Sequence, residues 1–117
     1  MIVYRVVCPR RDVGPWSVGD VYWGSDPETG HHPSNGPCPR EDTGRHIMDH
    51  EVCGCLSFEQ MRKWFRPCHV QAMEKAGLVL RKLKVDGRRI KKGEWQCVFP
   101  REAAVVIDEK PVTFLYV

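Results

Sequence analysis

The sequence predicts an α+β domain: a small antiparallel sheet, two central helices and a long loop rich in proline and glycine. Three observations lead to this prediction. A β-branched and aromatic segment opens the chain, two helical segments occupy the middle, and several strand-like segments follow them. The chain has 117 residues, of which 42% are hydrophobic, so it supplies one core and is expected to form a single domain over residues 1–117.

The N-terminal part divides into a strand and a long loop. Residues 2–7 are β-branched or aromatic apart from Arg5, and they predict the first strand. Residues 8–45 contain six of the nine prolines and six of the ten glycines. This density predicts a loop without long regular elements, in which only Val21, Tyr22 and Trp23 have the composition of a short strand.

A capped corner is predicted at residues 54–60, where a strand leads into the first helix. Ser57 is a favourable N-cap and Gln60 lies three residues later, which is the spacing of a capping box. Apolar residues then recur with helical spacing as far as Phe65. Residues 46–52, just before the corner, are expected to form a helical turn.

The second half of the chain predicts a helix followed by strands. Pro67 suits the first turn of the second helix, and Gly77 is its natural C-terminal cap. A strand is expected over residues 78–85, and Asp86-Gly87 is the strongest hairpin signal in the chain. Further strands are predicted over residues 95–99, 103–107 and 112–117.

Composition limits the classes of partner and the compartment. The net charge of +3 does not indicate a general polyanion binder. No apolar run approaches the roughly 20 residues that span a bilayer, so no membrane partner is expected. The apolar start is short and contains Arg5, which is unlike a signal peptide, so a cytoplasmic location is expected.

Cysteine and histidine residues raise the question of a metal site. Cys38, His46, His50, Cys53 and Cys55 fall within 18 residues, and thiolate and imidazole are ligands that zinc prefers. The C-x-C spacing differs from the C-x-x-C of zinc knuckles. The absence of an export signal also argues against disulfides. Buried free thiols in a reducing compartment are therefore expected, with zinc the less favoured alternative.

Several short motifs carry a resemblance to known proteins. The chain resembles small, uncharacterised proteins encoded by phages and prophages, and the resemblance covers most of its length. More distantly, the order of the motifs is similar to a minimal ADP-ribosyltransferase fold. The motifs are Tyr4-Arg5, Gly14-Pro15-Trp16, His32-Pro33, Glu41-Asp42-Thr43-Gly44, Gly54 to Phe65, and Gln96-Cys97-Val98-Phe99.

The resemblance implies a nucleotide site. Arg5 would hold the phosphates of NAD, since its planar fork suits phosphate bidentately. Ser57 would lie at the nicotinamide ribose, and Tyr4 and His32 would complete the binding set. Glu94 and Gln96 would fill the last motif. The catalytic carboxylate of the family corresponds to Gln96, whose neutral amide does not stabilise an oxocarbenium-like centre as a carboxylate does.

The leading hypothesis is thus a degenerate ADP-ribosyltransferase-like domain that binds NAD or a related nucleotide, with catalysis left open. Structural roles compete with each assignment. An arginine in a first strand is often paired at the surface, Ser57 is fully explained as a helix cap, and Gln96 would face solvent in an antiparallel strand.

A basic segment surrounds the predicted hairpin. It would follow a nucleic-acid backbone, contact an acidic protein surface, or simply be a solvated edge that resists aggregation. The low net charge favours the last of these interpretations. The basic residues are Arg81, Lys82, Lys84, Arg88, Arg89, Lys91 and Lys92.

A function of another class follows from the phage-type resemblance. The chain would be a non-enzymatic inhibitor that binds a host protein complex, such as a CRISPR or other defence system. The long loop and the basic hairpin would be its contact surfaces. Nucleic-acid binding through the hairpin is the third hypothesis.

Overall fold

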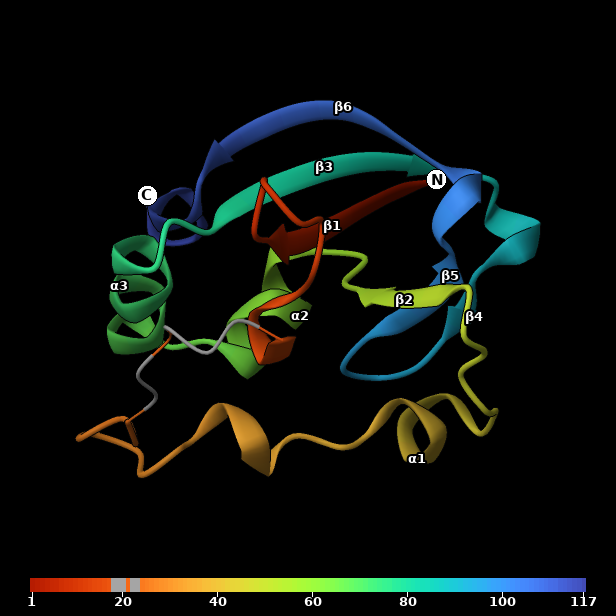
Figure 1. The fold of residues 1–117 in the computed structure, drawn as a ribbon. Coiled ribbons are helices and arrows are strands. Elements are labelled where there is room, and N and C mark those ends of the chain that lie inside the picture. The colour runs from red at the N-terminus through yellow and green to blue at the C-terminus, as the bar shows by residue number, and fades with distance from the viewer. Residues whose placement is uncertain (18–20, 22–23) are drawn as a thin grey trace.

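The computed structural model describes residues 1–17, 21 and 24–117. Within them the chain forms strands and short helices that confirm the α+β prediction (Figure 1). The helices are α1 (Pro39–Thr43), α2 (Phe58–Trp64) and α3 (Pro67–Lys75). The strands are β1 (Ile2–Val7), β2 (Glu51–Gly54), β3 (Val79–Val85), β4 (Lys91–Lys92), β5 (Cys97–Pro100) and β6 (Ala104–Pro111).

The strands form two small antiparallel sheets instead of the single sheet expected. One has the order β1-β3-β6 and the other the order β2-β5-β4. A bridge joins them, because Tyr4 and Cys55 exchange backbone hydrogen bonds of 2.7 and 2.8 Å. Strand β1 therefore connects the sheets, whereas β6 lies at the free end of the first sheet (Figure 1).

Two groups of buried side chains stabilise this arrangement. The first lies among β1, β3, α2, α3 and the final 3₁₀ helix (Val112–Tyr116), and it includes Met61, Met73 and Leu115. The second lies between the two sheets and includes Val3 and Phe99, both fully buried. In the part of the chain that the structure describes, no helix has the length and apolar composition needed for crossing a membrane.

The predicted corner is present, with one change in its capping. The Ser57 hydroxyl accepts a hydrogen bond from the backbone N–H of Gln60 at 3.1 Å, which confirms Ser57 as the N-cap of α2. The Gln60 side-chain oxygen accepts from the N–H of Leu56, at 2.8 Å, instead of from that of Ser57. Its amide group donates to the carbonyl oxygens of Gly93 and Glu94, so Gln60 ties α2 to the loop before β5.

Both predicted ends of the second helix are confirmed. Pro67 is the first residue of α3. Gly77 has φ of +81°, and the N–H of Leu78 returns to the carbonyl oxygen of Met73 at 3.0 Å. This is the left-handed helix end that glycine adopts without steric cost.

The long loop contains only short elements among its described residues, as expected. These are the 3₁₀ turns Pro15–Ser17 and Pro33–Asn35 and the five-residue helix α1. The expected short strand falls mostly on Tyr22 and Trp23, which lie outside the described residues. Residues 24–45, here called the strap, run along the side of the molecule opposite β6 (Figure 1).

The strap is fixed by the carboxylate of Asp42. It accepts hydrogen bonds from three successive backbone N–H groups, those of Glu94 (2.8 Å), Trp95 (3.0 Å) and Gln96 (2.9 Å). Successive N–H groups that converge in this way form a nest for an anion. The Gln96 side chain adds a bond of 3.0 Å to the carbonyl oxygen of Pro37.

Three local predictions were wrong, each because a distant partner or a different local bond determines the structure. Residues 46–52 do not form a helical turn, since β2 begins at Glu51 and pairs with β5. Asp86-Gly87 does not form a hairpin: the Asp86 side chain accepts from the N–H of Arg88 and caps a 3₁₀ turn between the two sheets. Residues 112–117 are not a strand.

The final segment follows a 3₁₀ pattern. Val112 and Leu115 are both fully buried, and their spacing of three places them on one side of a 3₁₀ helix. Before it, β6 extends from Ala104 to Pro111, longer than predicted.

Removal of the Asp42 charge tests the attachment of the strap. We expect Asp42→Asn to lower the free energy of unfolding by about 2 kcal/mol, because hydrogen bonds to a charged group contribute roughly 1.5–3 kcal/mol. Denaturant unfolding measures the loss. Glu41→Gln, an exposed neighbour in α1, is the control. Equal stability of the two variants would contradict the assignment.

Acid sensitivity is expected from His69, which is buried at the start of α3. Its Nδ1 accepts from the N–H of Arg66 at 3.0 Å, so the hydrogen is on Nε2, which donates to the carbonyl oxygen of Gly24 at 2.6 Å. Burial lowers the pKa of His69, and the nearby His31 and His32 act in the same direction, whereas Asp26 and the Gly24 carbonyl oppose them.

Because the folded state resists protonation of His69, stability should be complete above pH about 6.5 and should fall as the pH drops below that value. Its slope should reach at most about 1.4 kcal/mol per pH unit for one proton. Unfolding curves between pH 8 and 5 measure it. His69→Gln should flatten this part of the profile, and an equal slope in the variant and the wild type would contradict the assignment to His69.

Candidate functional site

A cavity of about 290 Å³ lies where β1, β2 and α2 meet. The turn at residues 13–17 forms another wall, and Gln96, just before β5, and Arg101, just after it, also line the cavity. Most of its lining is apolar. A concave apolar space with a few polar groups is typical of small-molecule sites.

Arg5 is the central polar residue of this cavity. It is only 9% exposed, and its Nε donates to the carbonyl oxygen of Cys53 at 3.1 Å. Its Nη1 lies 3.5 Å from Asp12, which is a long contact, and its Nη2 makes no hydrogen bond to any residue that the structure describes. Burial lowers the pKa of Arg5, and Asp12 opposes this effect. A largely buried cation therefore retains donor capacity next to a cavity.

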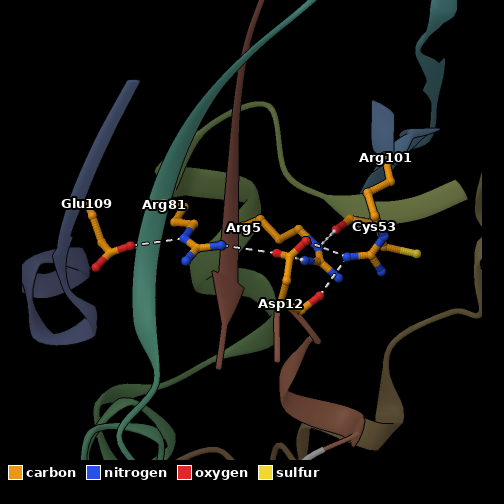
Figure 2. Close-up of polar contacts among 6 residues, drawn as sticks. All are labelled: Arg5, Asp12, Cys53, Arg81, Arg101 and Glu109. Carbon is orange, nitrogen blue, oxygen red and sulfur yellow. Dashed lines mark hydrogen bonds and ion pairs between the residues drawn. The ribbon is translucent and has the colours of Figure 1, made fainter. Parts of the chain in front are cut away.

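Two further arginines lie beside Arg5 and share Asp12 with it (Figure 2). The Asp12 carboxylate accepts from Arg81 at 3.0 Å and from Arg101 at 2.5 Å. Arg81 also pairs with Glu109 at 2.9 Å. In the sheet, Arg5, Arg81 and Glu109 stand in one row across β1, β3 and β6. We call these five residues the arginine cluster.

The turn after β1 explains the position of Asp12. Cys8 pairs with Val13, and the N–H of Asp12 returns to the carbonyl oxygen of Cys8 at 2.9 Å. Asp12 has φ of +50°, a left-handed conformation that aspartate adopts more readily than most residues. This turn brings the carboxylate back against the sheet face that carries Arg5 and Arg81.

Gln96 and Glu51 add polar groups to the cavity lining. Gln96 is buried, and its amide nitrogen is held by the carbonyl oxygen of Pro37. The buried carboxylate of Glu51 accepts from Lys91 at 2.8 Å and from the N–H of Met48 at 2.8 Å. The hydrogen bond from Lys91 lowers the pKa of Glu51, so this group stays ionised and paired.

Aromatic residues form one side of the cavity. The Trp16 ring centroid lies 6.2 Å from that of Trp64 and 6.1 Å from that of Phe65. Trp64 is fixed by a bond of 2.8 Å from its indole N–H to the carbonyl oxygen of Trp95. Trp16 is more than half exposed and lies at the rim. This wall offers a flat apolar surface on which an aromatic ring of a ligand could pack.

The structure brings together only part of the predicted nucleotide site. Arg5 and Gln96 both line the cavity. Tyr4 belongs to the opposite face of β1, where its ring lies 4.6 Å from that of Phe58. Ser57 is occupied as the cap of α2.

The other two predicted residues are also absent from the cavity lining. His32 caps the turn at Ser34, whose N–H it accepts at 3.1 Å. The Glu94 side chain is 80% exposed and lies 3.9 Å from Lys63. Glu94 and Gln96 therefore differ in environment, and the described structure does not unite them in one motif.

Three residues of the site were missed by the sequence analysis: Asp12, Glu51 and Arg101. Asp12 precedes a Gly-Pro pair, which marks a turn but not the direction of its carboxylate. Glu51 is the first residue of β2 and Arg101 follows β5, and the pairing of these strands was not predicted. Only the placement of β2 against β5 brings them near Arg5.

The basic segment is distributed over different surfaces. Four of its seven residues form ion pairs: Arg81 in the arginine cluster, Arg88 with Asp86, Arg89 with Glu102, and Lys91 with Glu51. It extends from β3 through a 3₁₀ turn to β4, which belong to different sheets. The expected basic hairpin is therefore wrong as a structure.

The cysteines are free thiols. Cys55 and Cys97 are buried, as expected, and burial raises the pKa of both, to about 12 for Cys97. Cys38 is exposed, which contradicts the expectation for that residue. Over the described residues, no three or more His, Cys, Asp or Glu side chains form a group that could hold a metal ion.

A comparison with models of protein families shows which family the chain belongs to. The chain is of a phage-encoded type, which confirms that part of the resemblance. It belongs to the family described as Bacteriophage T4 Y00F protein, whose sequence pattern matches residues 1–113. No curated protein matches the chain. No solved structure matches it either, and nothing in these comparisons supports an ADP-ribosyltransferase-like fold.

Asp12→Asn tests the arginine cluster. Asparagine keeps the side-chain size and tolerates the left-handed conformation, so the change removes mainly the charge. We expect a loss of about 1–2 kcal/mol of unfolding free energy, larger at low salt because three guanidinium groups then repel each other. Denaturant unfolding at two salt concentrations measures it.

Asp86→Asn is the matched control, since it breaks an ion pair with the fully solvated Arg88. Its effect on the free energy of unfolding should be smaller than that of Asp12→Asn, because a solvated ion pair contributes little to stability. A salt dependence that is the same for both variants would show that Asp12 carries no special electrostatic role.

Proposed function

We propose that this phage-family protein binds a nucleotide-type ligand in the Arg5 cavity without performing transfer chemistry on it. One observation supports the proposal most: Arg5 is 9% exposed, yet its Nη2 has no hydrogen-bond partner in the described structure and it borders a cavity. Nη2 is open to solvent, since it is Arg66 Nε, and not Arg5 Nη2, that is buried without a hydrogen-bond partner in the described structure. This donor is therefore accessible to an anion that enters the cavity. A phosphate group suits it, because the guanidinium fork binds phosphate bidentately.

The remaining walls fit the rest of such a ligand. The flat surfaces of Trp16 and Phe65 would contact a base, and the Gln96 side-chain oxygen would accept a hydrogen bond from it. A volume of about 290 Å³ lies just below the range of typical ligand sites, roughly 300–1,000 Å³. A mononucleotide or one half of a dinucleotide such as NAD therefore fits better than a complete dinucleotide.

The positions of the carboxylates near the cavity favour binding without catalysis. Glu94 points into solvent, and Gln96 is an amide held by the strap. Glu51 lines the cavity, but Lys91 and the N–H of Met48 already bind its Oε1. A transfer reaction of the ADP-ribosyl type needs a carboxylate beside the reacting carbon, so it is not part of the proposal.

The other two hypotheses have less support. Nucleic-acid binding would draw on a basic segment of which four residues are paired with acidic groups. Inhibition of a host defence complex rests on membership of a phage family. Affinity capture from a host lysate, with and without the basic residues, tests the second of these.

Calorimetric titration with AMP, ADP-ribose, NAD and adenosine tests the proposal. We expect the three phosphate-bearing ligands to bind, and adenosine to bind at least about tenfold more weakly. Arg5→Lys should weaken phosphate binding by a similar factor, because lysine lacks the planar fork. Arg88→Lys, an exposed arginine outside the cavity, should leave the affinity unchanged.

Thermal unfolding of each variant checks that it is folded. If Arg5→Lys is unstable, Trp16→Ala at the rim provides a second variant that should weaken binding. The proposed function would be excluded if millimolar nucleotide gave no heat of binding to the wild-type protein and no change in its thermal unfolding midpoint.

A further inference from the structure

A second hollow lies on the face of the first sheet that is opposite to the arginine cluster. Successive strand residues point to opposite faces, so Tyr4 and Lys82, which are paired, share one face, whereas Arg5 and Arg81 share the other. The hollow has a volume of about 250 Å³ and is lined by residues of β1, β3, β6, α2 and the final 3₁₀ helix. It has no lining residue in common with the Arg5 cavity, so its role does not depend on the proposed function.

Three aromatic side chains line this hollow. The ring centroids of Tyr4 and Phe58 are 4.6 Å apart with 55° between the ring planes, and Phe114 of the final 3₁₀ helix is 41% exposed. The Tyr4 hydroxyl makes no hydrogen bond to any residue that the structure describes. Accessible rings of this kind are the surface on which the bases of a single-stranded nucleic acid stack.

Lysine side chains lie beside the aromatic ones. Lys82 and Lys110 line the hollow, and Lys84 lies two residues beyond Lys82 on the same face of the sheet. Lys82 and Lys84 take part in no ion pair of the described structure. The Lys110 ammonium group lies 5.3 Å from the ring centroid of Phe114. Two of the three cations are therefore free to bind an anion.

Among the described residues that line the hollow, Asp108 is the one acidic side chain. Its Oδ2 lies 4.0 Å from Lys110, and its Oδ1 accepts from the N–H of Glu109 at 2.8 Å. The side chains of Asp108 and Lys110 are both 47% exposed, and an exposed ion pair contributes little. This face therefore has an excess of positive charge, although the net charge of the whole chain is low.

We propose that this face binds single-stranded nucleic acid, with one base in the hollow and the backbone phosphates beside Lys82, Lys84 and Lys110. Proteins that bind single strands combine a positively charged surface with aromatic side chains on which bases stack. Aromatic residues on an antiparallel sheet serve this purpose in an RNA-binding module. The bases of a duplex are paired and stacked, so they cannot enter the hollow. An acidic protein surface would engage the lysines but leave the aromatic residues unused.

This surface differs from the basic hairpin expected from the sequence. Lys82 and Lys84 belong to that basic segment, whereas Lys110 comes from β6 and reaches the same face because β6 pairs with β3. The four residues of the segment that form ion pairs have no part in the proposal. The sheet, and not a continuous run of basic residues, assembles the positive charge.

Fluorescence anisotropy with labelled oligonucleotides of about ten nucleotides tests the proposal, since single-strand sites cover roughly 4–16 nucleotides. Unstructured strands of thymidine (DNA) and of uridine (RNA) distinguish the two sources of this ligand. We expect at least one of them to bind, and a duplex of the same length to bind at least about tenfold more weakly. Three phosphate contacts predict a slope of about −2 when the logarithm of the binding constant is plotted against that of the salt concentration.

Two variants separate the phosphate contacts from the stacking. Lys82→Gln should make the salt slope shallower by about 0.7, which is the expected loss for one phosphate contact. Phe114→Ala should weaken binding about tenfold and leave the salt slope unchanged, because a stacked base carries no charge. Two controls should bind as the wild type does: Lys92→Gln removes an exposed lysine of the second sheet, and Trp16→Ala removes an exposed ring at the Arg5 cavity.

Circular dichroism confirms folding of each variant, and Phe114→Leu, which keeps apolar volume without a ring, replaces Phe114→Ala if the latter is unfolded. Failure of both strands to bind at low salt would overturn the proposal, and so would a duplex that binds equally well. A loss with Lys92→Gln as large as that with Lys82→Gln would reduce the binding to general charge attraction. A loss with Trp16→Ala as large as that with Phe114→Ala would place the strand at the Arg5 cavity instead, which also overturns the proposal.

Discussion

The arrangement of the two sheets depends on one carboxylate, that of Asp12. Antiparallel pairing of β1 with β3 places Arg5 directly opposite Arg81, and like charges in that position repel. Asp12 lies between them and also binds Arg101, which follows the last strand of the second sheet. A turn of five residues after β1 thus offsets the repulsion within one sheet and connects that sheet to the other.

The sharing of the Asp12 carboxylate among three arginines also determines the polar side of the cavity. Asp12 makes short contacts with Arg81 and Arg101 but only a contact of 3.5 Å with Arg5. Arg5 is therefore buried by the sheet, oriented by the carbonyl oxygen of Cys53, and incompletely neutralised. Donor capacity remains on the side where the aromatic wall begins. The charge arrangement that links the two sheets therefore also leaves a guanidinium donor beside the cavity.

Sequence reasoning succeeded where the determining contacts are local. The Ser57 cap and the Gly77 helix end each depend on hydrogen bonds that span at most five positions. It failed at residues 46–52, because β2 begins there and pairs with a strand far along the chain. It also failed at Asp86-Gly87, where the Asp86 side chain caps a 3₁₀ turn in place of a hairpin. Arg5 and Gln96 were grouped through a resemblance that the comparisons do not support, and they share the cavity because β2 joins β1 to β5.

Gln96 connects the cavity with the strap. Its side-chain nitrogen holds the carbonyl oxygen of Pro37, and its backbone N–H belongs to the nest around the Asp42 carboxylate. The same side chain borders the cavity. A ligand that bonds to its side-chain oxygen would restrict the rotation of the whole amide group and thereby strengthen its bond to Pro37. Occupancy of the cavity and the order of the strap are then thermodynamically linked, with neither requiring a change of fold.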